Sequence, residues 1–241
     1  MKLEVCIYSA ESAINDELSL ADRIELCAGF YEGGITPSYG TIALVRKSTL
    51  CSLVVMIRPR GGDFIYSPEE FITMKKDIQM AKQLGANGIA LGILLPDGRI
   101  DKIRTKELIE SAKPLKTTFH RAFDMCINPI EALEDIIQCG AHTLLTSGQK
   151  KQAIDGAELI KELIQKAGNR IEIMPGSGIN EHNIQQLAFT TKAKWFHLSA
   201  KKSTESPMQF RNKEIEMGPY ERIAVDEDKI KRIKSLLNEM A

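Results

Sequence analysis

Residues 53–64 read Leu-Val-Val-Met-Ile-Arg-Pro-Arg-Gly-Gly-Asp-Phe, an apolar run that ends abruptly in a charged loop with two adjacent glycines. The pattern predicts a buried strand that feeds a loop at a functional site. Glycine permits positive φ and lets the backbone approach a ligand closely. Two interpretations of the loop stay open. Arg58 and Arg60 bind an anion through their planar guanidinium groups, or an arginine pairs with Asp63 and only shapes the loop.

A short apolar run followed by a stretch of helical length recurs along the whole chain. We expect eight strands, at Leu3–Ile7, Arg23–Cys27, 53–58, Ile89–Gly92, Lys116–His120, Thr143–Thr146, Ile171–Met174 and Trp195–Ser199. The helices are expected at about 11–18, 37–48, 67–84, 105–112, 129–140, 153–167, 181–189 and 227–239. Eight similar βα units without a linker predict one α/β domain over residues 1–241, a (β/α)8 TIM-like barrel.

Three local expectations accompany this assignment. Pro37 fits the first turn of the second helix, where a missing N–H costs nothing. Asn180 is the expected cap of the helix at 181–189. Residues 200–225 show no regular pattern and are expected to be irregular.

Composition excludes several classes of protein. Lys plus Arg is 32 and Asp plus Glu is 32, so the chain lacks the basic excess of nucleic-acid-binding domains. No apolar run approaches the length of a membrane span, and the first residues lack the apolar segment of a signal peptide. We therefore expect a cytoplasmic protein without nucleic-acid or membrane partners. Five cysteines without regular spacing predict free thiols rather than disulfides.

The functional groups of such a barrel lie where the strands end and the following loops begin. His120 and Asp124 after the fifth strand, together with Glu25 on the second, are candidates for general acid–base catalysis. The alternative for His120 is a hydrogen bond to loop backbone. The turn around Ser177 leads towards a helix, a place where this fold often binds phosphate. The residues expected to bind a small anionic or phosphorylated substrate are Arg58, Arg60, Asp63, Arg121, Ser147, Gly176, Gly178 and Ser199.

Two cysteines on the first two strands are candidates for a metal site. Because side chains alternate along a strand, Glu4 shares a face with Cys6, and Glu25 shares a face with Cys27. The opposite faces are apolar and suit packing under helices, so the polar faces should point into the barrel. If the two strands are neighbours, the thiols lie side by side. Soft thiolates select Cu(I) or zinc, and two ligands suit Cu(I) better. The alternative is that both cysteines simply pack.

The chain resembles the CutC family over nearly its whole length. The motifs that carry the resemblance are Glu4-Val5-Cys6, Ala21-Asp22-Arg23-Ile24-Glu25-Leu26-Cys27, Glu32-Gly33-Gly34-Ile35-Thr36-Pro37-Ser38, Ile57-Arg58-Pro59-Arg60-Gly61-Gly62-Asp63-Phe64, Thr118-Phe119-His120-Arg121-Ala122-Phe123-Asp124-Met125, Leu145-Thr146-Ser147-Gly148 and Phe210-Arg211-Asn212. Two departures leave the cysteines untouched. Leu18-Ser19-Leu20 replaces a usual Gly-Gly, and Gly176-Ser177-Gly178 resembles a family Gly-Gly-Gly turn.

The resemblance implies a TIM-barrel-like fold, a role in copper homeostasis, a cytosolic location and oligomers, commonly homodimers. It also implies Cu(I) as the ligand of Cys6 and Cys27. The ring of polar residues at the strand ends is richer than a two-thiol copper carrier requires. A second hypothesis is therefore an enzyme that acts on a small anionic substrate at that ring, with His120 or a carboxylate as acid or base.

Overall fold

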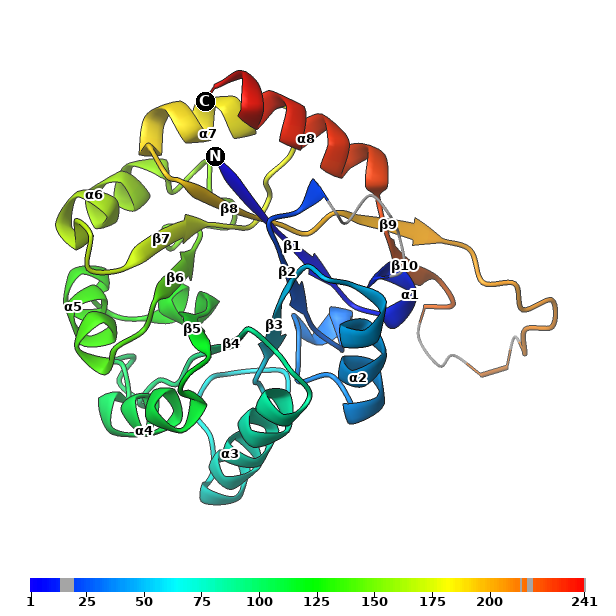
Figure 1. The fold of residues 1–241 in the computed structure, drawn as a ribbon, viewed down its shortest axis with the longest axis horizontal. Helices are drawn as coiled ribbons and strands as arrows, with labels where there is room; N and C mark the ends of the chain where they lie inside the picture. Colours follow the sequence, from blue (N-terminus) through cyan, green and yellow to red (C-terminus); the bar gives the residue numbers. More distant parts are fainter. Residues whose placement is uncertain (14–19, 213, 216–218, 241) are drawn as a thin grey trace.

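A computed structural model describes residues 1–13, 20–212, 214–215 and 219–240, and Figure 1 shows them as a ring of strands enclosed by helices. The barrel strands are β1 Lys2–Ile7, β2 Arg23–Leu26, β3 Ser52–Met56, β4 Gly88–Leu91, β5 Lys116–Phe119, β6 Thr143–Thr146, β7 Glu172–Pro175 and β8 Trp195–Leu198. The helices are α1 Ala10–Ala13, α2 Tyr39–Ser48, α3 Pro68–Gln83, α4 Lys102–Ala112, α5 Pro129–Cys139, α6 Ala157–Ala167, α7 Ile184–Thr191 and α8 Glu227–Glu239. The 3-10 helices η2 Phe30–Glu32 and η3 Arg121–Met125 follow β2 and β5. The predicted (β/α)8 barrel is confirmed.

The sheet closes into a barrel because its last strand, β8, contacts both the first strand, β1, and the preceding strand, β7. The eight strands pair in parallel in the order β7-β6-β5-β4-β3-β2-β1-β8. β7 and β8 meet at one bridge, between Gly176 and His197. A Cβ on Gly176 would lie 2.5 Å from Leu145 Cδ1 and 3.1 Å from His197 Cβ. Glycine at this position therefore lets the two strands come together.

Alternation along β1 and β2 divides the buried side chains between two layers. Leu3, Val5, Ile7, Ile24 and Leu26 are at most 1% exposed and belong to the large core between barrel and helices. A second, smaller apolar cluster inside the barrel consists of Cys6, Cys27, Val54, Met56 and Ala90. The predicted inward face of these strands is confirmed.

Capping residues place several helix starts away from the predicted positions. α2 begins at Tyr39, because the Ser38 side chain accepts a hydrogen bond from Thr41 N, so Pro37 precedes the cap rather than occupying the first turn. α7 begins at Ile184 and not at 181. Asn180 does not cap it, since its Oδ1 accepts from His182 N in a local turn.

Three other predicted helices also differ in extent. The helix predicted at 105–112 begins at Lys102, where Asp101 caps it, and the one predicted at 153–167 begins at Ala157. Of the helix predicted at 11–18, the structure shows α1 to Ala13, and the remainder lies outside the described residues.

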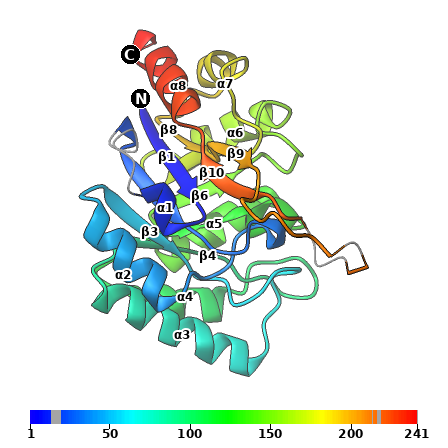
Figure 2. The same ribbon diagram turned by 90° about the vertical axis from the view of Figure 1, so that its right-hand side faces the viewer.

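Residues 200–225 contain a hairpin, which corrects the expectation of an irregular segment. β9, Lys201–Thr204, pairs antiparallel with β10, Arg222–Val225. The pair forms the base of an arm that projects from the barrel in Figures 1 and 2. The side chains of β9 are polar and mostly exposed, so this strand lacks an apolar pattern in the sequence, whereas β10 carries the short apolar run Ile223-Ala224-Val225. In the part of the chain that the structure describes, no helix has the length and apolar character needed to span a membrane.

Candidate functional site

A cavity of about 840 Å³ lies at the end of the barrel where the strands meet their following loops. Its lining includes Cys6, Glu25, Cys27, Arg58, His120, Arg121, Asp124, Gly178 and Ser199, all predicted as site residues. The remaining predicted residues, Arg60, Asp63, Ser147 and Gly176, are not part of the lining as far as the structure describes it. Most of the predicted site residues therefore share this cavity.

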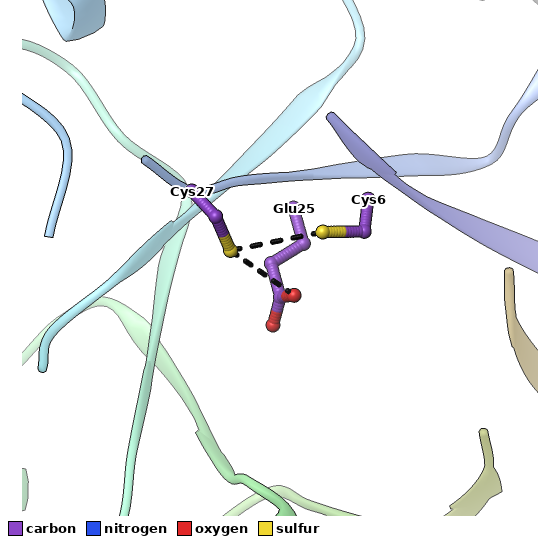
Figure 3. Close-up of side chains that lie close together, drawn as sticks. All are labelled: Cys6, Glu25 and Cys27. Atoms are coloured by element: carbon purple, nitrogen blue, oxygen red, sulfur yellow. Dashed lines mark hydrogen bonds between the residues drawn. The ribbon is translucent and has the colours of Figure 1, made fainter. Parts of the chain in front are cut away.

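The two candidate thiols touch each other at the floor of the cavity. Cys6 on β1 lies opposite Glu25 on β2, so Cys27 is its diagonal neighbour. The sulfur atoms are 3.7 Å apart, and Cys27 Sγ is 3.6 Å from Glu25 Oε2. Dashed lines mark both contacts in Figure 3. The ligand atoms of these three buried residues all lie within 4.8 Å of one another. The predicted side-by-side arrangement of the thiols is confirmed.

The environment of the thiols separates their protonation states. The hydrogen bond between the two thiols lowers the pKa of Cys6 to about 5, although burial acts in the opposite direction. The same hydrogen bond, followed by burial, raises the pKa of Cys27 well above its ordinary value. Burial raises the pKa of Glu25 to about 8, with a further contribution from the charge of Cys6. Cys6 is therefore the more acidic thiol of the pair.

A buried acid–base cluster supports the thiols from below. Glu4, which is 0% exposed, accepts hydrogen bonds from His197 Nδ1 at 2.7 Å and from Arg23 Nε. Burial alone would raise the pKa of Glu4, but the hydrogen bond from His197 and the charge of Arg23 lower it. For His197, burial acts to lower the pKa, and the carboxylates of Glu25 and Glu4 outweigh it and raise the pKa well above its usual range.

His197 joins the thiol group to the carboxylates, and sequence reasoning assigned it no role. Its Nε2 lies 3.9 Å from Glu25 Oε2, and Glu4, Glu25 and His197 form a second set of possible metal ligands within 4.8 Å. The available signal was strand alternation, because Phe196 and Leu198 point into the outer core and place His197 on the inner face.

Arg58 uses its guanidinium to hold two loops together. Nη1 donates to Glu32 O at 2.7 Å and to Gly34 O at 2.9 Å, and Nη2 donates to Gly62 O at 2.8 Å. The side chain is buried, with Phe64 packed under it. The positive charge faces the cavity, but two of the three nitrogen atoms are bound to carbonyl oxygens of the protein.

Arg60 is not part of the cavity lining and pairs with acidic side chains. Its Nε donates to Glu70 Oε1 at 2.6 Å, and its Nη2 donates to Asp63 Oδ1 at 3.0 Å. This arrangement matches the loop-shaping interpretation of the motif. Anion binding by Arg60 and Asp63 stays a prediction.

Asp124 organises the loops after β5 and β6. Its Oδ1 accepts from Thr146 Oγ1 at 2.6 Å and from Gln149 N at 3.2 Å. Its Oδ2 accepts from Arg121 Nε at 2.8 Å, and Arg121 Nη2 donates to Ser147 Oγ at 2.9 Å. With both oxygens bound to protein donors, the carboxylate is suited to positioning Arg121 rather than to moving a proton.

His120 is a neutral imidazole in the cavity wall. Its Nδ1 accepts from Ala122 N at 3.1 Å, which is the predicted alternative of a hydrogen bond to loop backbone. Burial, together with the charge of Arg58, lowers the pKa of His120 to about 3.

The turn after β7, Gly176-Ser177-Gly178, has two glycines with different structural roles. Gly176 closes the barrel, whereas Gly178, with φ +69°, lines the cavity. Because α7 begins only at Ile184, the turn does not lead directly into a helix N-terminus. Anion binding at this turn and at Ser199 stays a prediction.

The fold and the site define a class of protein: a (β/α)8 barrel with a buried dithiol and an acid–base cluster at the floor of its cavity. The sequence model of the protein family described as the CutC family matches residues 1–202. The chain is 48% identical over 232 residues to a CutC family protein of Bacteroides fragilis, which covers 96% of this chain and 92% of the relative. It is also 48% identical over 216 residues to the human protein named copper homeostasis protein cutC homolog, over 90% of this chain and 79% of the relative.

Solved structures agree with the sequence relatives. The crystal structure of CutC from Streptococcus agalactiae has a TM-score of 0.78 and 32% identity, covering 82% of this chain and 97% of that chain. Phosphoribosylanthranilate isomerase from Pyrococcus furiosus, with a TM-score of 0.59 and 12% identity, shares the barrel fold alone. The chain belongs to the CutC family.

Proposed function

We propose that this protein binds Cu(I) through Cys6 and Cys27 as part of copper homeostasis. The observation that carries the proposal is the 3.7 Å contact between two buried, unbridged thiols at the floor of an open cavity. Thiolates are the soft ligands that Cu(I) prefers. The relatives named as copper homeostasis proteins support the same function.

The spacing of the sulfur atoms suggests more than two ligands. With metal–sulfur bonds of about 2.3 Å, two sulfurs of a tetrahedral site are about 3.8 Å apart, and those of a linear site about 4.6 Å. The observed 3.7 Å fits the bent arrangement. Glu25 and His197 are the nearest candidates for a further ligand, and zinc is the competing metal to be tested.

A Cu(I) competition titration on reduced protein under anaerobic conditions tests the proposal. We expect one tight equivalent in the wild type, its loss in the Cys6→Ser/Cys27→Ser double variant, and its retention in Cys51→Ser, whose thiol is outside the cavity lining. A parallel Zn(II) titration measures the preference for copper. Copper binding that is unchanged in the double variant would contradict the two-thiol site.

Compartment and assembly complete this proposal. Free thiols that bind a metal need a reducing environment, so we place the protein in the cytosol. We also propose a homodimer, for which light scattering coupled to size-exclusion chromatography should give twice the mass of 26.9 kDa. A mass equal to that of one chain would contradict it.

A second candidate function, binding of a small anionic substrate, is favoured by the shape of the cavity. Above the thiols the cavity has an apolar wall that includes Phe30, Phe64 and Leu145, and its cationic side chains include Arg121 and Lys201. Apolar walls with a few polar groups are typical of sites for organic molecules, and a metal ion needs only the floor. A thermal-shift screen of carboxylated and phosphorylated metabolites should give stabilising hits that Arg121→Ala reduces. No hit in the wild type would contradict this function.

A further inference from the structure

Among the described residues, three that line the cavity have a buried polar atom without a hydrogen-bond partner: Glu25 Oε1, Arg58 Nε and His120 Nε2. Buried polar atoms of this kind are rare in folded proteins and point to a missing partner. A metal on the thiols accounts for Glu25, which lies beside them. It does not account for His120, which is outside both groups of possible metal ligands.

His120 is fixed in one orientation and one tautomer. Because Nδ1 accepts a hydrogen bond from Ala122 N, the proton of the neutral ring is on Nε2. Phe64 packs against the ring with centroids 5.2 Å apart. On the other side, a Cβ at Gly92 would be only 2.6 Å from Cε1 and Nδ1, so the end of β4 is cleared for the ring. The Nε2 edge is the one left for the cavity.

The residue that follows His120 supplies a fixed positive charge to the same cavity. Asp124 and Ser147 bind two of the three nitrogen atoms of Arg121 at 2.8 and 2.9 Å, and its side chain is still 42% exposed. A neutral donor and a cation on adjacent residues match a ligand with one neutral oxygen and one carboxylate.

We propose that the cavity binds a small hydroxy- or oxo-acid whose hydroxyl or carbonyl oxygen accepts a hydrogen bond from His120 Nε2–H and whose carboxylate faces Arg121. The proposal rests on the second candidate function and is independent of copper binding. Burial and the charge of Arg58, which lower the pKa of His120 to about 3, keep the ring a neutral donor throughout the physiological range.

The test uses reduced, metal-free protein with ¹⁵N-labelled histidine, kept with a chelator so that copper plays no part. The chain has four histidines, so the ring signals are few enough to assign. Lactate and pyruvate are the probes, and propionate, which lacks the second oxygen, is the matched control. We expect saturable shifts of the His120 Nε2 signal with lactate and pyruvate, and binding of propionate at least tenfold weaker.

Variants of the histidine separate its donor from its structural role. Asn in place of His120 keeps a short acceptor for Ala122 N but lacks the distal donor, so His120→Asn should weaken lactate binding at least tenfold. His120→Gln places an amide donor near the Nε2 position and should recover part of it. The exposed His142, outside the cavity, provides the control His142→Gln.

Three results would overturn the proposal: equal binding of propionate, a His120 signal that no probe moves, or full lactate binding in His120→Asn. If a metabolite stabilises the protein in the thermal-shift screen while the His120 signal stays unmoved, the second candidate function survives and this ligand class does not.

Discussion

Arg58 and Arg60 are two residues apart in one motif but have different surroundings. Arg58 is buried and binds three carbonyl oxygens, whereas the Arg60 side chain is 39% exposed and pairs with carboxylates. The planar guanidinium donates hydrogen bonds to all three carbonyl oxygens at once, and a lysine ammonium lacks this geometry. Arg58→Lys should therefore lower the free energy of unfolding by about 3 kcal/mol.

Arg60→Lys is the matched control for this substitution, because exposed ion pairs contribute at most about 1 kcal/mol. Urea denaturation followed by circular dichroism measures both variants. Equal losses in the two would show that the carbonyl contacts of Arg58 do not support the loops.

His120 should make stability depend on pH in a defined direction. Its pKa is about 3 in the folded protein, against about 6.5 for an ordinary histidine. Between these two pH values the unfolded chain binds more protons than the folded protein. The contribution of His120 to the free energy of unfolding is therefore complete above pH 6.5 and is lost as the pH falls towards 3. Between pH 7 and 5 the wild type should lose about 2 kcal/mol more than His120→Asn.

Denaturation curves of the wild type and His120→Asn at the two pH values test this, because the carboxyl groups titrate alike in both proteins and cancel. Parallel losses in the two proteins would show that His120 becomes protonated in the folded state.

At the level of single strands, the sequence alone predicts which side chains point into the barrel. The two-residue period of β1 and β2 was enough to place Cys6 and Cys27 inside the barrel, because alternation needs no knowledge of other strands. The contact between His197 and Glu4 spans 193 positions and exists only because β8 pairs with β1. Its prediction needs the closure of the barrel as well as the pattern of each strand.

The positions at which helices begin also depend on packing that the local sequence pattern does not determine. Around α7 several neighbouring polar residues are possible caps, and the helix begins after Asn183 rather than Asn180. The alternation of apolar runs with stretches of helical length predicted a helix after β7, but the choice between candidate caps depends on how the loop packs. The β9–β10 hairpin escaped prediction because β9 has polar, mostly exposed side chains and the apolar part of β10 is only three residues long.

The end of β4 must be free of a side chain for the His120 site to form. A Cβ at Gly92 would meet the imidazole at 2.6 Å and Ala122 Cβ at 2.9 Å, so Gly92→Ala forces the ring to move. We expect a destabilisation of about 1–3 kcal/mol, a displaced His120 Nε2 signal and lactate binding at least tenfold weaker.

Gly40→Ala in α2 is the matched control for Gly92→Ala. Its Cβ would have Ser38 Oγ as nearest neighbour, at 4.0 Å, and alanine favours the helix by up to about 1 kcal/mol. Denaturation and histidine NMR measure both variants. An unmoved His120 signal in Gly92→Ala would mean that the ring has room that the packing does not show.

The thiol site spans the seam where the whole molecule closes. Cys6, Glu25 and His197 come from β1, β2 and β8, the first two strands and the last strand of the barrel. In Figure 2 the two chain termini lie near each other beside α8. α8 stabilises this seam from outside, since Lys234 Nζ contacts Asp22 Oδ2 at 2.6 Å and the same oxygen accepts from Leu3 N at 2.8 Å.

The last helix should therefore control stability without controlling affinity. Leu237 in α8 is 0% exposed, so Leu237→Ala should lower the free energy of unfolding by about 2–5 kcal/mol. Asn238→Ala, at an exposed neighbouring position, should change it by less than about 0.5 kcal/mol. Because α8 contributes no ligand atom, Cu(I) affinity of the folded variant should stay within about threefold of the wild type. Urea denaturation and the Cu(I) titration measure the two quantities separately, and a large loss of affinity in Leu237→Ala would show that α8 sets the geometry of the thiols.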